Sequence, residues 1–429
     1  MGFENKQASS SSNALKARPT EDTPLIGKDK PLSSQSKTFA NVFIAIVGAG
    51  VLGLPYAFKR TGWIMSLIML FSVAALTHYC MMLLVHTRRK LQSFSSDFSN
   101  INSFGDLGFT VCGSIGRLVV DIMIVLSQAG FCVGYLIFIA NTLVNLFNSS
   151  SSQSLTSQIM GLSAKSFYIW GCFPFQLVLN SVATLTHLAP LSIFADIVDL
   201  GAMGVVMVED VLLMMRNRPE VRAFGGTSVF FYGMGVAVYA FEGIGMVLPI
   251  ESEMKEKEKF GRTVGLSMAF ISLLYGSFGV LGYFAFGDET KDIITANLGA
   301  GLISSLVQLG LCINLFFTFP LMMNPVYEIA ERRFWGGTYC LWLRWVLVLA
   351  VSLVALLVPN FADFMSLVGS SVCCGLGFVL PALFHLLVFK EEMDLKGWCI
   401  DVGILTVGVV LAVSGTWYAL MEIFSVKVL

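Results

Sequence analysis

The sequence predicts an all-α integral membrane protein with eleven transmembrane helices, arranged as a 5+5 inverted repeat plus one extra helix. Hydrophobic residues make up 55% of the 429-residue chain and charged residues only 13%, about half the charged share of a soluble domain. Apolar runs recur along the chain, and each supplies the roughly 20 residues that a membrane helix needs. A third observation, an interruption in both the first and the sixth run, predicts the repeat.

The eleven apolar runs follow one another with short polar connections. Their approximate limits are 38–58, 62–86, 117–147, 166–187, 190–214, 227–250, 263–286, 299–326, 338–358, 361–388 and 398–424. We expect the first repeat to cover about 38–214, the second about 227–388, and the extra helix 398–424. Residues 1–37 are polar and rich in Ser and Lys, which predicts a disordered cytosolic tail.

The distribution of Lys and Arg predicts the orientation. Basic clusters at 88–90, 255–262 and 331–333 share the side of the N-terminus, which places the N-terminus in the cytosol and the C-terminus in a lumen. The basic segment 216–222 opposes this assignment, whereas the glycosylation sequon at Asn148 agrees with it. The charged run 251–262 is expected to be a solvated cytosolic loop that continues the sixth helix and could help to close the inner side.

The first and sixth runs contain similar interruptions. Residues 48–55 read GAGVLGLP and residues 241–249 read FEGIGMVLP. Gly and Pro weaken the helical hydrogen-bond ladder, and unwound backbone at membrane depth is tolerated only against protein or a watery cavity. Glycines could instead allow close helix packing, but two matching interruptions favour broken helices 1 and 6 around a central binding site.

Unwound backbone could bind a zwitterion through both of its charges. The positive end of a half-helix suits a carboxylate, and free carbonyls suit an ammonium group. For Phe241 and Tyr135 the alternatives are packing and contacts between helices. The expected substrate-binding residues are Gly48, Ala49, Gly50, Val51, Leu52, Gly53, Phe241, Gly243, Ile244, Gly245 and Tyr135.

Three acidic residues inside apolar runs are candidates for proton coupling. Glu242 stands at the second interruption, and a carboxylate in a membrane is a functional hypothesis by default. Asp196 and Asp199 are three residues apart, so a helix would place both on one face. The alternatives are an acid that only props open the unwound segment, and two aspartates that only face water.

Other classes of function lack their motifs. No P-loop, H-E-x-x-H or G-x-S-x-G is present, and no basic stripe indicates a nucleic-acid partner. The nine cysteines show no C-x-x-C spacing, so no metal or redox site is expected. We therefore expect no enzyme activity and no cofactor, and the lipid bilayer as a partner.

The N-terminal tail contains a candidate sorting signal. Residues 21–26 read EDTPLI, which matches an acidic dileucine signal through Glu21, Leu25 and Ile26. Adaptor coats read such signals and send membrane proteins to vacuolar or lysosome-like compartments. A chance match in a polar tail is the alternative.

Three segments resemble the amino acid/auxin permease family, in its branch of vacuolar and proton-coupled neutral amino acid transporters. They read GAGVLGLPYAFKRTGW, FCVGYLIFIANT and YAFEGIGMVLPIE. The resemblance covers about 38–424 and implies the fold of the amino acid–polyamine–cation superfamily. It also implies proton-linked movement of small neutral amino acids, with export from the vacuolar lumen to the cytosol.

Two positions qualify the resemblance. Animal proton-coupled members have a histidine where this chain has Asn41, so that proton site does not carry over. Sodium-coupled relatives place a polar residue where this chain has Ile44, which makes sodium the less expected coupling ion. A non-transporting amino acid sensor and a plasma-membrane importer of the same fold are the alternative functions.

Overall fold

The described part of the chain is helical. The computed structural model describes residues 32–94, 101–148, 163–182, 189–217, 219–226, 229–298 and 301–425. Its α-helices are α1 (Gln35–Ile46), α2 (Leu54–Thr61), α3 (Trp63–Phe94), α4 (Phe104–Asn148), α6 (Ala164–Asn180), α7 (Ala189–Asn217), α8 (Phe230–Ala240), α9 (Val247–Glu253), α10 (Phe260–Phe286), α11 (Leu302–Trp335), α12 (Leu341–Leu357), α13 (Phe361–Val368), α14 (Leu380–Val388) and α15 (Leu395–Ser425).

Each predicted run carries helix in the described ranges. Within the described part of the chain, seven helical stretches are long and apolar enough to cross a membrane, and α1 with α2 makes an eighth if that bent pair is one span. The helices α6, α7 and α12 fill the remaining three runs. Length and composition, judged on the described residues alone, identify up to eight of the eleven predicted spans. Of the other three helices, α6 and α12 are only 17 residues long, whereas α7 has 29 residues.

The outer surface is apolar. Large hydrophobic side chains stand exposed on many helices, among them Leu302 at 78%, Trp342 at 73% and Leu395 at 77% exposure. A water-soluble protein rarely exposes so much contiguous apolar surface, whereas a bilayer solvates it.

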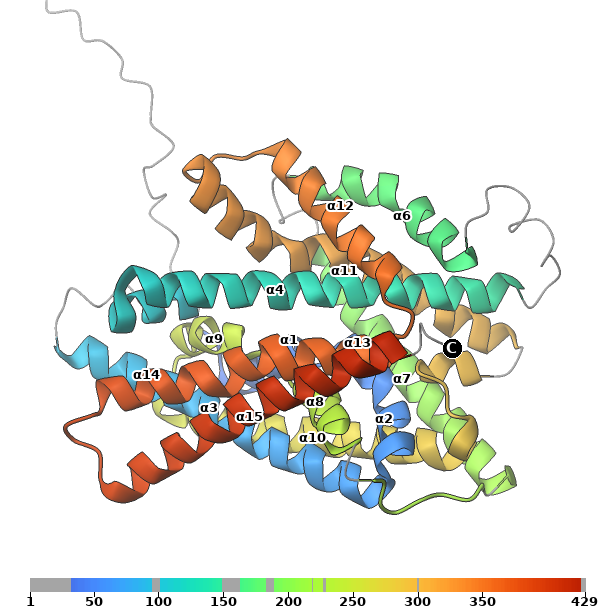
Figure 1. Ribbon diagram of the computed structural model, residues 1–429, viewed down its shortest axis with the longest axis horizontal. Coiled ribbons are helices and arrows are strands. Elements are labelled where there is room, and N and C mark those ends of the chain that lie inside the picture. Colours follow the sequence, from blue (N-terminus) through green and yellow to red (C-terminus); the bar gives the residue numbers. More distant parts are fainter. Residues whose placement is uncertain are drawn as a thin grey trace, which may run out of the picture.

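The helices form two groups in space, and one of them takes equivalent helices from both predicted repeats. Helix α11 packs along α4, with α6 and α12 beside them, and these four lie together in one part of the molecule (Figure 1). They occupy the third, fourth, eighth and ninth predicted runs. The third and fourth runs therefore each have a counterpart five runs later, as a repeat of five helices requires.

Helix α8 lies at the centre of the other group, which includes α2, α3, α13 and α15. Every residue from Tyr232 to Ala240 is buried, and α8 packs against α2, α3, α13 and α15. Its close neighbour is the tenth run, in which the α-helix gives way to two π-helical segments, η9 (Gly369–Cys373) and η10 (Gly375–Val379). Such π-helical segments occur often at functional sites.

Glycine sets the distance between α8 and η9. A Cβ added to Gly369 would overlap the carbonyl oxygen of Gly235, and a Cβ added to Gly235 would lie 2.5 Å from the carbonyl oxygen of Ser366. The two backbones therefore touch, and this contact holds α8 in its central place.

We predict that Gly369→Ala lowers the unfolding free energy by about 1–3 kcal/mol, because the extra methyl forces the two backbones apart. The thermal unfolding midpoint of the detergent-solubilised protein measures the effect. Gly377→Ala is the matched control, because it makes the same change in the other π-helical segment, where an added Cβ meets nothing within 4 Å. Equal midpoints for the two variants would contradict the close contact.

Candidate functional site

The first predicted break is present in the structure. Helix α1 ends at Ile46, and the next two residues are extended, with φ −76° and ψ 119° at Val47 and φ −160° and ψ −161° at Gly48. The chain then makes the 3₁₀ segment η1 (Ala49–Gly53) and continues as α2, at an angle of 50° to α1. Pro55 falls in the first turn of α2, where its missing N–H costs little.

The second predicted break has the same construction. Helix α8 ends at Ala240, and after Gly243 the 3₁₀ segment η5 (Ile244–Met246) leads into α9. In both breaks a glycine carbonyl accepts the first hydrogen bond of the new turn, from Val51 N to Gly48 O at 3.3 Å and from Met246 N to Gly243 O at 3.1 Å. Neither 3₁₀ segment has a side-chain cap.

The two breaks touch one another. A Cβ on Gly50 would lie 3.1 Å from the Cα of Ala240, and a Cβ on Gly243 would lie 2.7 Å from Cγ1 of Ile46. The absence of a side chain at both positions therefore allows the two chains to approach, with the tighter contact at Gly243. At Gly48 and Gly245 an added Cβ meets nothing within 4 Å, so there is open space beside each break.

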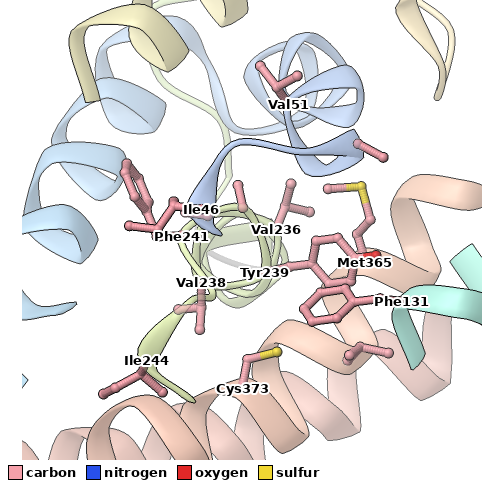
Figure 2. Close-up of a cluster of buried hydrophobic side chains, with 14 of the residues drawn as sticks. Ile46, Val51, Phe131, Val236, Val238, Tyr239, Phe241, Ile244, Met365 and Cys373 are labelled. Carbon is pink, nitrogen blue, oxygen red and sulfur yellow. The ribbon is translucent and has the colours of Figure 1, made fainter. Parts of the chain in front are cut away.

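Most of the predicted substrate-binding residues lie at this junction. Residues 49–53 are buried, as are Phe241 and Ile244, whereas Gly48, Gly243 and Gly245 are partly buried. Figure 2 shows Phe241 beside Ile46 on one side of α8, and Tyr239 facing Phe131 and Met365 on the other. The structure thus brings together two segments that are almost 200 residues apart.

Tyr275 of α10 supports the first break, and the sequence analysis missed it. Its hydroxyl donates to the carbonyl oxygen of Ile46 at 3.2 Å, and its ring lies 5.3 Å from that of Phe241. An unwound helix end inside a bilayer needs such a donor for its free carbonyl. The signal in the sequence was a tyrosine in the middle of an otherwise apolar run.

Tyr239 is a second missed residue. Its hydroxyl is buried and has no hydrogen-bond partner in the described ranges. The predicted residue Tyr135 of α4 is buried and lies within electrostatic range of this hydroxyl, and Phe131 stacks edge-on against the Tyr239 ring at 4.8 Å. The third run therefore reaches the side of α8 that faces away from Phe241.

The acidic candidates have different surroundings. Glu242 is partly buried at the second break, within electrostatic range of the thiols of Cys373 and Cys374, and its carboxylate has no ion pair or hydrogen bond among the described residues. Asp199 of α7 interacts electrostatically with Tyr275 and so lies near the first break. Asp196 also belongs to α7, but its side chain is outside the described part.

Four other predicted residues lie at the edge of the described ranges or beyond them. The sorting residues Glu21, Leu25 and Ile26 lie outside the described ranges. Asn148 is the last residue of α4, and its side chain is likewise not described. Within the described ranges, no three His, Cys, Asp or Glu side chains are grouped to hold a metal ion.

Charged residues gather at the two ends of the broken helices. At the end near Ser33, here called the N-terminal face, Glu251 forms ion pairs with Arg88 and Arg89. The expectation that the run 251–262 is solvated is wrong for its first residue, because Glu251 is fully buried. Arg88 and Arg89 stand in a basic stretch of α3 more than 160 residues before Glu251, so the sequence gave no hint of this pairing.

The opposite end carries a second charged cluster. Arg60, at the end of α2, lies 3.6 Å from Asp363 and 2.9 Å from Glu422, and its guanidinium stacks on the ring of Tyr232. The Tyr232 hydroxyl donates to Asp363 at 3.1 Å. The continuation of the first broken helix is thus tied to α8, α13 and α15.

We predict that Tyr275→Phe loosens the first break, because the Ile46 carbonyl loses its donor. Amide hydrogen exchange of residues 44–52 should become faster, and the unfolding free energy should fall by about 1 kcal/mol. Tyr283→Phe is the control on the same helix, since it removes the hydroxyl that accepts from Arg222 N at 2.9 Å, away from the break. Unchanged exchange at residues 44–52 in Tyr275→Phe would refute this role.

Two solved transporters have a similar fold. A closed conformation of Mhp1, a nucleobase-cation-symport-1 family transporter with bromovinylhydantoin bound, matches with a TM-score of 0.54 at 15% identity, covering 92% of this chain and 93% of that chain. MhsT in complex with L-phenylalanine matches with a TM-score of 0.55 at 10% identity, covering 89% and 98%. These likenesses confirm the all-helical, multi-span transporter fold.

Sequence relatives share more residues with this chain than the two solved transporters do. Amino acid transporter AVT3B of Arabidopsis thaliana is 74% identical over 409 residues, which cover 95% of this chain and 98% of that protein. Vacuolar amino acid transporter 3 of Schizosaccharomyces pombe is 28% identical over 411 residues, covering 91% of this chain and 60% of that protein. The family described as transmembrane amino acid transporter protein matches residues 32–421. The chain therefore belongs to the transmembrane amino acid transporter family, a family of transporters rather than enzymes.

Proposed function

We propose that the protein is a secondary active transporter that moves small neutral amino acids across the vacuolar membrane by alternating access. The observation that carries the proposal is the contact between two broken helices near the middle of their spans. Gly50 meets Ala240, Gly243 meets Ile46, and open space adjoins Gly48 and Gly245. Discontinuous helices of this kind form the substrate sites of secondary transporters.

The chemistry of the junction suits an amino acid. The 3₁₀ segments η1 and η5 begin at glycines without a side-chain cap, so their N–H groups can bind a carboxylate. The extended residues Val47 and Gly48 offer carbonyls to an ammonium group. The apolar residues Phe241 and Ile244 border the junction, which favours a neutral side chain.

Protons are the proposed coupling ion, and Glu242 is the first candidate to carry them. It is an acid at the break with no cation paired to it among the described residues. Asp199, near Tyr275, is the second candidate, and Asp196 remains a third from its spacing. Sodium is the less favoured ion, because Ile44 is apolar.

The proposed location is the vacuolar membrane, with the N-terminus in the cytosol and the C-terminus in the lumen. The relative from Schizosaccharomyces pombe is named as vacuolar, and the EDTPLI segment offers a signal for adaptor coats. In this orientation an acidic lumen would drive export of amino acids into the cytosol. An amino acid sensor and a plasma-membrane importer are the alternatives.

We predict gradient-driven flux through the purified protein. With one proton per amino acid, a gradient of about one pH unit supplies about 1.4 kcal/mol, which corresponds to a roughly tenfold accumulation of substrate. Liposomes with a panel of radiolabelled neutral amino acids measure it. Glu242→Gln should keep exchange of substrate but lose the response to pH, because an amide cannot take up the proton.

Glu253→Gln serves as the control for charge, since Glu253 is exposed at the end of α9. A wild-type protein that binds amino acids without any flux would be a sensor. Full pH-driven accumulation in Glu242→Gln would remove this residue from the proton path and leave the aspartates of α7.

We predict that Leu25→Ala combined with Ile26→Ala moves a fluorescently tagged protein away from the vacuolar membrane, because an adaptor coat needs both apolar side chains of the signal. Microscopy of plant or yeast cells shows the location. Leu32→Ala is the control, because Leu32 is an exposed leucine at the start of the described region. Retention at the vacuole in the double variant would discard the signal.

A further inference from the structure

The ion pairs at the N-terminal face are unusually deep. Glu251 is fully buried near the end of α9, and Arg88 of α3 is only 2% exposed. The guanidinium of Arg88 contacts one carboxylate oxygen of Glu251, and Arg89 donates to the other from Nη2 at 2.9 Å and from Nε at 3.2 Å. Two cations thus surround one carboxylate at the end of the second broken helix.

These contacts fasten the whole of α9 to α3. Besides its ion pair, Arg88 donates from Nη1 to the carbonyl oxygen of Leu248 at 2.9 Å. Leu248 lies in the first turn of α9 and Glu251 in the second. One arginine therefore binds both turns of the short helix that follows the second break.

The first broken helix is attached at the same place. Ser33 N donates to Glu253 O at 2.8 Å, and Lys255 N donates to Ser33 O at 3.1 Å, so Ser33 forms a parallel bridge with Met254. Gln35, the first residue of α1, donates to the carboxylate of Glu256 at 2.9 Å. The start of α1, the end of α9 and α3 form one connected unit.

The space between this unit and the breaks is closed. A cavity of about 10 Å³ lies there, lined by apolar residues that include Val42, Ala45, Gly243 and Val247. It barely holds one water molecule, and no amino acid could pass through it. The passage between α1 and α9 is therefore closed at this cavity, and one of these helices must move before a ligand at the breaks can leave between them.

A buried ion pair is poorly suited to adding stability, because desolvation offsets most of its attraction. It is better suited to a two-state contact, since water that enters on separation solvates both charges. We propose that Glu251 and Arg88 are positioning residues that lock the N-terminal face, and that they separate each time this face opens. The proposal rests on the proposed transport function, because only a carrier needs the face to open.

The test uses Ala45→Cys as a reporter, since Ala45 lines the closed cavity. A membrane-impermeant maleimide reacts with the purified protein in lipid nanodiscs, and mass spectrometry follows the peptide that carries residue 45. Combining Arg88→Met with Glu251→Leu removes both charges of the pair and keeps apolar bulk, a replacement that is often neutral or stabilising. We expect labelling about tenfold faster than in the reporter alone, a typical coupling for contacting residues.

Three further variants distinguish an ion pair that breaks when the face opens from one that only stabilises the fold. Glu258→Gln changes the same charge at an exposed position of the same segment and should label at the reporter's rate. Glu251→Gln should label faster but also unfold at a lower temperature, because Arg88 is left buried without its counter-charge. If the double variant fails to fold, Arg88→Lys tests the lock instead. Lysine keeps the charge but cannot bind both Glu251 and Leu248 O, so we expect the labelling rate of residue 45 to increase.

Labelling at the reporter's rate in the folded double variant, or in Arg88→Lys, would overturn the lock. The experiment requires no flux, so its failure differs from a failure of the proposed function. If the variants label as expected but the wild-type protein moves no amino acid in liposomes, the proposed opening motion stands and the proposed transport function fails.

Discussion

A bilayer offers no hydrogen bonds to peptide groups, and this constraint organises the structure around its two broken helices. Each break leaves N–H and C=O groups that must be met by protein or by a ligand. The structure meets part of this demand directly, through the Tyr275 hydroxyl on Ile46 O and the glycine carbonyls that start η1 and η5. The remaining polar groups at the junction are what a zwitterion could bind.

The breaks can meet only because neighbouring segments pack so closely that their backbones are in contact. Gly50 and Gly243 allow the two segments to touch, and Gly235 with Gly369 holds α8 against the π-helical segment η9. The glycines at the breaks therefore permit close packing at Gly50 and Gly243, and they adjoin open space at Gly48 and Gly245. The two interpretations of these glycines are compatible.

Charged clusters stand at both ends of this apolar centre. Glu251 pairs with Arg88 at the N-terminal face, and Arg60 lies near Asp363 at the opposite end. The alternating access that we propose requires a central site and a closure at each end, because only one closure is open at a time. The covalent continuity of α1 with α2, and of α8 with α9, connects each break to both closures.

The sequence alone determined the membrane class, the order of the helical runs and the position of both breaks. These follow from local chemistry: apolar length sets a span, and Gly with Pro interrupts one. Only the tertiary structure decided which side chains serve the breaks. Tyr275, Tyr239 and the burial of Glu251 depend on contacts between residues far apart in the chain, and a single sequence carries no record of such distances. Glu251 belongs to a charged run that predicts exposure to solvent. Its carboxylate can be buried only because α3 brings arginines that offset the cost of removing the charge from water.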